Sequence, residues 1–447
     1  MILIKNGHVV GAAGGPADVL IEGDRVVAIC ENLPSADGTT VIDAAGCIVA
    51  PGLVDMHVHF RDPGYEYKED VFSGAAAAAA GGVTTCCCMP NTSPVIDNAK
   101  IVKRLLKKAG DAAVTVVPYG AVTLGQKGVE LTDFASLKKA GVIALSDDGN
   151  PVQNARLMYI AMQAAREADM LIVSHCEDAD LAQNFAVNEG KVSWELMIPG
   201  RPAIAEEIMV ARDAMLAAKT GARVHIAHVS AAGSVEIIRK AKTAGMAITA
   251  ETCPQYFTLT EDEILTQGAL ARVNPPLRTK ADAEAVIDGL EDGTIDAIAT
   301  DHAPHSAEEK ALPLEEAPSG MIGLETSLAL ALTHLYHTGK LGMEKIIELM
   351  SVNPARILGI GCERRDDGGK GCGDGRGDEG GWGVGIAGAA SAFPLHHADI
   401  VVFDPDKEWT VRPEKFRSKA RNTPFGGMKL RGKVMYTISR GKVVYSP

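Results

Sequence analysis

Two histidines separated by one residue are the first side chains in this sequence that could do chemistry together. His57 and His59 lie in the apolar run LVDMHVHF, a pattern that predicts a β-strand. Side chains two apart on a strand leave the same face, so both imidazoles could reach one metal ion. An H-x-H pattern is short, and by itself it leaves a metal site and a chance pair equally open.

Three further potential ligands each follow another apolar run. His175 follows LIVS, His228 follows HIA, and Asp301 follows AIAT. Asn91 and Asp148 end two other runs in the same way. Imidazoles and carboxylates that converge from separate strands are typical of a metal-dependent catalytic site, which favours that interpretation over chance.

The elements that must position these residues alternate between strand-like and helical patterns. Eight candidate strands occur in order: LVDMHVHF, GVTTCCCMP, AAVTVVPYG, GVIALSD, LIVSHCED, RVHIAHVS, AITAETCP and IDAIATDHAPH. Ala- and Lys-rich stretches such as NAKIVKRLLKKAG separate them and predict helices. Eight strand-then-helix units predict an α/β fold, the (β/α)₈ TIM barrel, whose catalytic groups gather at the carboxyl ends of the strands.

The two ends of the chain show a different pattern, of short β-rich segments with turns. Neither end has enough strands for a stable sheet of its own, so we expect them to combine into one small β-sandwich domain. The expected division is residues 1–50 and 395–447 for that domain, 51–358 for the catalytic barrel and 359–394 for a Gly-rich flexible linker.

The overall composition restricts the partners. The chain has 447 residues, is 46% hydrophobic and 23% charged, and carries a formal net charge of −13. That charge argues against a nucleic acid or an anionic membrane as partner, because both require basic patches, and it favours a small-molecule substrate. The sequence shows neither a signal-peptide pattern nor an apolar stretch long enough to span a bilayer, so we expect a cytoplasmic protein.

Several local motifs resemble those of one enzyme family. They are DMHVHFRDPG at 55–64, MPNT at 89–92, SDDG at 146–149, SHCED at 174–178, HIAHVS at 225–230, NPPLR at 274–278, ATDHAPH at 299–305 and RNTPFGG near the C-terminus. Together they resemble the amidohydrolase superfamily and, within it, the class I bacterial dihydroorotase family. The motifs recur in order over more than 350 residues, so the resemblance is specific.

The resemblance implies a centre that holds two Zn²⁺ ions per subunit. His57 and His59 would hold one zinc together with Asp301, which is also the implied catalytic acid and base. His175 and His228 would hold the second, with Asp148 between the two. Strand alternation leaves Asp147 and Asp148 open, and it is the interval in the family that indicates Asp148. Hydantoinases and allantoinases carry a carboxylated lysine as the bridge, whereas GVIALSDDGN contains no lysine.

The resemblance also implies the substrate and its contacts. Dihydroorotases interconvert N-carbamoyl-L-aspartate and L-dihydroorotate in de novo pyrimidine (UMP) biosynthesis. The ring of that substrate carries a carboxylate, which a guanidinium can bind with two parallel hydrogen bonds. The implied substrate-binding residues are His59, Arg61, Asn91, Asn274, His305, Ser319 and Gly320. Arg61 lies two residues beyond His59, on the same face of the strand. From the residues alone, a surface arginine paired with Asp62 or Glu66 is favoured over substrate binding, and the resemblance reverses that preference.

Two alternatives remain open at this point. One is another cyclic-ureide hydrolase of the hydantoinase or dihydropyrimidinase type, and the other is a non-catalytic scaffold for aspartate carbamoyltransferase. The resemblance favours a homodimer and allows association with that carbamoyltransferase. We expect residues 305–320 to form a mobile lid, and His225 and His302 to be packed or hydrogen-bonded rather than ligands.

Overall fold

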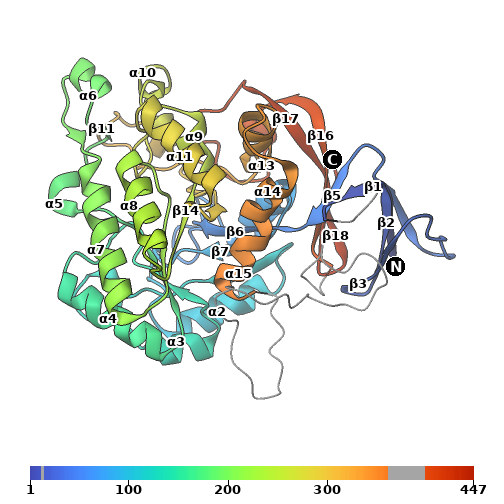
Figure 1. Cartoon of the computed structure of the whole chain (residues 1–447), viewed down its shortest axis with the longest axis horizontal. Helices are drawn as coiled ribbons and strands as arrows, with labels where there is room; N and C mark the ends of the chain where they lie inside the picture. Colours follow the sequence, from blue (N-terminus) through green and yellow to red (C-terminus); the bar gives the residue numbers. More distant parts are fainter. Residues whose placement is uncertain (12–14, 361–397) are drawn as a thin grey trace.

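A computed structural model of the chain describes residues 1–11, 15–360 and 398–447 (Figure 1). Eight parallel strands surround its centre: β6 (Leu53–Val58), β7 (Val83–Cys88), β8 (Thr115–Pro118), β9 (Ala144–Leu145), β10 (Leu171–Ser174), β13 (Val224–Ile226), β14 (Ile248–Thr252) and β15 (Ala297–Ile298). They pair in the orders β6-β7-β8 and β9-β10-β13-β14-β15. Parallel bridges from Gly120 to Leu145 and from Val58 to His302 connect the two groups at both edges. This arrangement confirms the predicted (β/α)₈ barrel.

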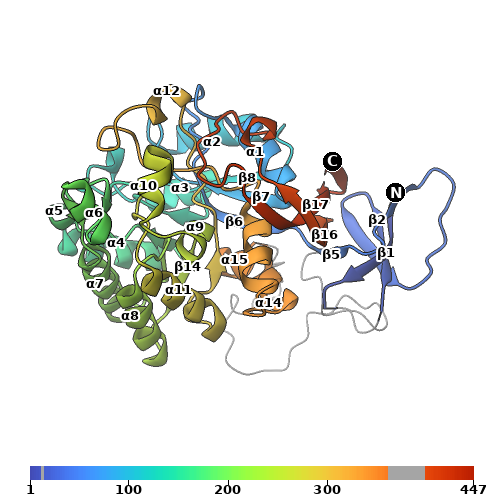
Figure 2. The same ribbon diagram turned by 90° about the horizontal axis from the view of Figure 1, so that it is seen from above.

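Helices follow the strands and form the outer layer of the barrel (Figures 1 and 2). The longer ones are α1 (Val71–Ala80), α2 (Ala99–Ala109), α3 (Phe134–Ala140), α4 (Ala155–Glu167), α7 (Ile204–Thr220), α8 (Ala232–Thr243) and α11 (Lys280–Asp292). Shorter ones are α5 (Ala179–Ala182), α6 (Lys191–Leu196), α9 (Pro254–Thr258), α10 (Glu263–Gln267), α12 (Ala307–Lys310), α13 (Ser327–Ala331), α14 (Met343–Ile347) and α15 (Asn353–Leu358). A two-stranded pair, β11 (Val187–Asn188) with β12 (Gly200–Arg201), lies between α5 and α7.

Helix α1 and strand β7 illustrate how the local sequence specifies these units. Asp70 caps α1 by accepting hydrogen bonds from the backbone of Phe72 and Ser73, and the Ala-rich helix ends at Gly81. Gly82 then has φ 84°, and a Cβ atom there would lie 2.6 Å from Val401 Cγ2. Only glycine combines this backbone conformation with so close an approach to the neighbouring domain.

The terminal segments form the small β domain that the sequence predicts. Strands β1 (Ile2–Val9), β2 (Ala17–Glu22), β3 (Arg25–Cys30), β4 (Thr40–Asp43) and β5 (Ile48–Pro51) come from the N-terminal part, and β16 (Ile400–Thr410), β17 (Lys429–Ser439) and β18 (Lys442–Tyr445) from the C-terminal part. They pair in the order β18-β17-β16-β5-β1-β2-β3, with β4 also on β1. Ile4, Val19, Val49, Ile400 and Ile438 share one buried cluster. Both termini therefore lie in one domain beside the barrel (Figures 1 and 2).

The predicted linker lies largely outside the residues that the structure describes. The expected Gly-rich linker, 359–394, lies outside them apart from its first two positions, and the division at residues 50, 358 and 394 stays a prediction. Across residues 1–11, 15–360 and 398–447, none of the helices is both long enough and apolar enough to cross a membrane.

Candidate metal centre and substrate rim

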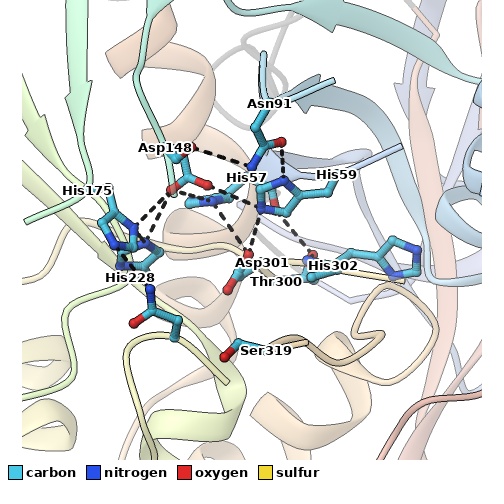
Figure 3. A network of polar contacts seen from close by, with 12 residues as sticks. His57, His59, Asn91, Asp148, His175, His228, Thr300, Asp301, His302 and Ser319 are labelled. Carbon is cyan, nitrogen blue, oxygen red and sulfur yellow. Dashed lines mark hydrogen bonds and ion pairs between the residues drawn. The ribbon is translucent and has the colours of Figure 1, made fainter. Parts of the chain in front are cut away.

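The first histidine pair lies where strand β6 loses its regular geometry. Between Asp55 and Val58 the strand has one residue more than its partner β7, which is a β-bulge. The backbone N–H of His57 donates to Asp55 Oδ1 at 3.0 Å. His59 lies just beyond the strand, and its N–H donates to the carbonyl of His302 at 2.8 Å. Both imidazoles are buried, and Figure 3 shows them directed toward Asp148 and Asp301.

Asp148 lies at the centre of the cluster, between the two histidine pairs (Figure 3). Its Oδ1 atom is 3.4 Å from His57 Nε2, 3.2 Å from His175 Nδ1 and 3.4 Å from His228 Nε2. Its Oδ2 atom is 3.5 Å from His59 Nε2. The neighbouring Asp147 instead accepts hydrogen bonds from the backbone of Val122 and Thr123. Of the two aspartates, Asp148 is therefore the one that faces the histidines.

Asp301 closes the cluster on the side opposite Asn91 (Figure 3). Its Oδ1 atom is 3.0 Å from His59 Nε2 and 3.5 Å from His57 Nε2. Asp301 has φ 49°, and His228 has φ 36°. Non-glycine residues rarely adopt such conformations, which cost of order 1–3 kcal/mol each and concentrate at functional sites.

A buried carboxylate behind the cluster orients His57. Glu251, from β14, accepts a hydrogen bond from His57 Nδ1 at 2.7 Å. Its second oxygen lies 3.3 Å from His225 Nε2, and His225 Nδ1 lies 2.8 Å from Thr249 Oγ1. Since Nδ1 of His57 is engaged by Glu251, the lone pair of Nε2 faces Asp148 and Asp301. His225 is thus hydrogen-bonded within the strand layer, which confirms the packed role expected for it.

The donor atoms of this cluster fit a bound metal. The ligand atoms of His57, Asp148 and His228 lie within 4.8 Å of one another, as do those of His57, His59 and Asp301. His57 Nε2 is buried without a hydrogen-bond partner, and His175 Nδ1 lies only 2.7 Å from His228 Nε2. Imidazole nitrogens that converge in this way beside a carboxylate are donor atoms that suit a shared divalent cation.

The charges around the cluster lead to the same conclusion. Burial disfavours a charged His175, but hydrogen bonds to Asp148 and Glu177 outweigh it and raise its pKa to about 10. Burial opposes ionisation of Glu251, yet His225 and His57 lower its pKa to about 2. These shifts show that the buried carboxylates favour positive charge within the cluster, and a divalent ion would also supply such charge.

Arg61 and His305 form one side of the rim. Arg61 has φ 60°, so the chain has left the strand, and alternation from His59 does not set its direction as the sequence suggested. The guanidinium instead donates from Nε to the Pro304 carbonyl at 3.2 Å and lies 3.4 Å from His305 Nε2. Asp62, its expected surface partner, pairs with Lys108 at 2.5 Å. Arg61 is half-buried and turned toward the site, not toward Asp62.

Asn91 and Asn274 flank the cluster from two other loops. Asn91 Oδ1 accepts a hydrogen bond from His59 Nδ1 at 2.9 Å, and its Nδ2 lies 3.5 Å from the Asp148 carbonyl. Asn274 Nδ2 is 3.4 Å from His175 Nε2, and its Oδ1 accepts from Arg201. Both asparagines are half-buried. Each fixes the outer nitrogen of a histidine and also borders the open side of the site.

Ser319 and Gly320 complete the rim. The Ser319 carbonyl accepts a hydrogen bond from His305 Nε2 at 2.9 Å, and Figure 3 shows Ser319 below Asp301. Gly320 has φ 138°, and a Cβ there would lie 2.7 Å from Ala303 Cβ. The residues predicted to bind substrate thus lie around the buried cluster, and the six predicted metal ligands form the cluster itself.

Comparison with known proteins identifies the family. A family model described as dihydro-orotase-like matches residues 46–234. Proteins named dihydroorotase from Clostridium acetobutylicum and Clostridioides difficile are each 46% identical to this chain; the alignments cover 100% of it and 99% and 100% of those proteins. The chain belongs to the dihydroorotase family.

Solved structures similar to this dihydroorotase-family chain share its whole fold. An L-hydantoinase (dihydropyrimidinase) from Arthrobacter aurescens aligns with a TM-score of 0.83 at 26% identity, over 100% of this chain and 96% of that one. A dihydropyrimidinase from Brevibacillus agri gives 0.81 at 25% identity, over 99% and 95%. The architecture is thus shared with a hydantoinase and a dihydropyrimidinase, while sequence identity is much higher with the dihydroorotases.

Sequence reasoning missed some residues that this member of the dihydroorotase family places around the site. Glu251 is one, and its signal was available as the one charged residue of the buried strand β14. Asn422 is another: it lies in the RNTPFGG motif, but no role was assigned to it. Lys310 gave no signal at all, because it lies in a polar segment that reads as surface.

Proposed function

We propose that this chain catalyses the reversible conversion of N-carbamoyl-L-aspartate to L-dihydroorotate, a step of de novo pyrimidine biosynthesis. The observation that carries the proposal is a buried His/Asp cluster with a half-buried guanidinium, Arg61, on its open side. Such a pairing suits a cyclic amide that also bears a carboxylate. A hydantoin ring is neutral and gives Arg61 no partner, so the hydantoinase alternative is not favoured.

The proposed metal cofactor is zinc, with two ions per subunit. His57 and His59 would hold one with Asp301, and His175 and His228 the other, with Asp148 shared between them. When zinc is bound, the chemistry it supplies is Lewis acidity, which makes water nucleophilic near neutral pH and polarises the attacked carbonyl. The strand end GVIALSDDGN has no lysine that could serve as a carboxylated bridge, which supports Asp148 as the shared ligand.

The chain's own residues handle the proton and the substrate. In ring opening, Asp301 accepts the proton of the attacking water and delivers it to the amide nitrogen as the C–N bond breaks. In ring closure it removes the proton from the ureide nitrogen, and water leaves. Arg61, Asn91 and His305 bind the ring carboxylate, while Asn274 and the backbone of Ser319 and Gly320 contact the ureide edge.

The fixed neighbours of Arg61 support its role. Because its Nε is engaged by the Pro304 carbonyl, the terminal nitrogens remain on the site side, where a carboxylate can approach. Burial lowers the pKa of His305, and the cations Arg61 and Lys68 add to that effect. His305 is therefore neutral at physiological pH, and its Nε2–H donates to the Ser319 carbonyl beside Arg61.

The test is a substrate comparison on protein of measured zinc content. The chain is expected to hydrolyse dihydroorotate and to leave hydantoin and dihydrouracil nearly untouched. Turnover of a neutral ring without turnover of dihydroorotate would refute the proposal in favour of the hydantoinase type. A zinc-loaded chain that is inactive on every ring would instead indicate the scaffold alternative, against which the complete ligand set argues.

The assembly of the protein is a further part of the proposal. We infer a homodimer, with association with aspartate carbamoyltransferase as an additional state. Light scattering of the purified chain, alone and mixed with the carbamoyltransferase from the same source, tests both. The cytoplasmic location stays a prediction from the sequence.

A further inference from the structure

The turn Pro318–Gly320 borders the substrate side, and the side chain of Lys310 binds its backbone carbonyls. Lys310 is the last residue of α12, and its Nζ donates to the carbonyls of Pro318 at 2.9 Å and Gly320 at 3.0 Å. A third, longer bond reaches the Arg272 carbonyl at 3.4 Å. All three ammonium protons thus point at backbone oxygens. These bonds connect two parts of the segment 305–320, which is predicted to be a mobile lid, and they also join it to the loop that contains Arg272.

Lys310 is a buried cation that lacks a carboxylate partner among the ion pairs of the described residues. The residue is only 7% exposed, and the adjacent Glu309 pairs with Lys68 instead, at 2.8 Å. Burial, with added repulsion from Arg272, lowers the Lys310 pKa to about 7. Holding a lysine in such a place reduces stability, and an apolar side chain of similar length is often at least as stable there. A role in function would account for the lysine better than a role in stability.

We propose that Lys310 is a positioning residue for the reaction: it fixes the Ser319–Gly320 backbone against His305 so that the turn keeps one shape toward the substrate. This inference rests on the proposed function, in which that backbone contacts the ureide edge. Lys310 does not itself reach the substrate side. It acts only through the carbonyls that it holds.

The close packing of the turn explains why its shape depends on these bonds. His305 Nε2 donates to the Ser319 carbonyl at 2.9 Å, and Gly320 is pressed against Ala303. The same His305 lies 3.4 Å from Arg61. A shift of the turn would therefore move His305 and Arg61, so that both ends of the substrate would lose their contacts together.

A second anchor indicates that removing Lys310 loosens the turn without unfolding it. Asn422, from the C-terminal segment, donates from Nδ2 to the carbonyls of Gly320 and Ala303, each at 3.1 Å. Its Oδ1 accepts from the His305 backbone at 3.1 Å. Without Lys310, Gly320 would keep its bond to Asn422, whereas Pro318 would lose its lysine donor.

The experiment compares Lys310→Met with the parent chain, both zinc-loaded and at full length. We expect KM for dihydroorotate to rise roughly tenfold and kcat to stay within about threefold. Zinc content should be unchanged and Tm equal or higher. A purely structural lysine predicts the opposite pattern, a lower Tm with an unchanged KM, and that result would overturn the inference.

Two further variants sharpen the comparison. Lys280→Met removes a lysine whose side chain is 84% exposed and should change neither KM nor Tm. Lys310→Gln keeps two N–H donors without a charge, so its KM should lie between those of the parent and Lys310→Met; a parental KM in both Lys310 variants would overturn the inference. Failure of the proposed function would look different, because then the parent chain itself would not turn over dihydroorotate.

Discussion

Replacing Glu251 by glutamine tests whether the buried carboxylate behind His57 contributes to metal binding. Glu251 is fully buried and accepts from His57 Nδ1 at 2.7 Å. A hydrogen bond to a charged acceptor contributes about 1.5–3 kcal/mol, and one to a neutral acceptor about 0.5–1.5 kcal/mol. Glutamine keeps the shape of the side chain and a neutral acceptor. The variant should therefore lose about 1–2 kcal/mol of the hydrogen-bond free energy that orients His57. That loss corresponds to a roughly tenfold weaker zinc affinity, at the lower end of the effects known for residues that support metal ligands.

The assay is zinc competition against a chromophoric chelator at one pH, with circular dichroism to verify the fold. Glu261→Gln is the matched control, because Glu261 is also a buried glutamate and accepts from Asn188 Nδ2 at 2.9 Å, but it has no contact with the metal ligands. Its zinc affinity should equal that of the parent. If folded Glu251→Gln also binds zinc as tightly as the parent, then Glu251 does not support His57, and the reasoning from its hydrogen bond is wrong.

Three further perturbations follow from the structure. Arg61→Met should lower kcat/KM for dihydroorotate by about 100-fold or more, because the charge pair between the guanidinium and the substrate carboxylate loses one partner. Any residual activity on dihydrouracil should stay constant, and equal losses on both rings would contradict carboxylate binding. Asp301→Ala should abolish turnover and leave most zinc bound by metal analysis, so retained turnover would remove its acid–base role. Gly82→Ala should lower the free energy of unfolding in urea by about 2 kcal/mol, because the position combines φ 84° with a 2.6 Å distance from the added Cβ to Val401. Gly110→Ala serves as the control, because its added Cβ would lie 3.4 Å from the nearest atom, the Lys107 carbonyl oxygen.

The barrel and most of the site could be predicted because each depends on a short-range pattern. The eight strands are apolar runs of regular spacing, and their carboxyl ends meet at one rim in any barrel of this kind. His57, His175 and His228 therefore converge whatever their separation in the chain. The choice of Asp148 over Asp147 was different, because alternation left it open and only the family interval indicated it. The structure gives the physical reason, since the Asp147 carboxylate is occupied by the backbone of Val122 and Thr123.

The rest could not be predicted because it depends on departures from regular geometry. The bulge in β6 between Asp55 and Val58, which includes His57, leaves no mark in the sequence LVDMHV, which reads as an even strand. Arg61 was placed by strand alternation, and that reasoning failed because the chain turns at φ 60°. Lys310 lies in the segment predicted to be a mobile lid, yet its three acceptors are backbone carbonyls, which no side-chain pattern encodes.

The strained residues of the site are held by side chains and not only by a metal. After His228, at φ 36°, Glu206 accepts from the backbone N–H groups of Ser230 and Ala231 at 3.1 and 3.2 Å. Before Asp301, at φ 49°, the N–H of Thr300 donates to Asp55 Oδ1 at 3.2 Å. Through these hydrogen bonds the buried carboxylates hold the backbone beside the two strained residues. Local strain persists where the surrounding structure holds the backbone in this way. The geometry of the candidate ligands is therefore built into the fold, and folding has already met its conformational cost.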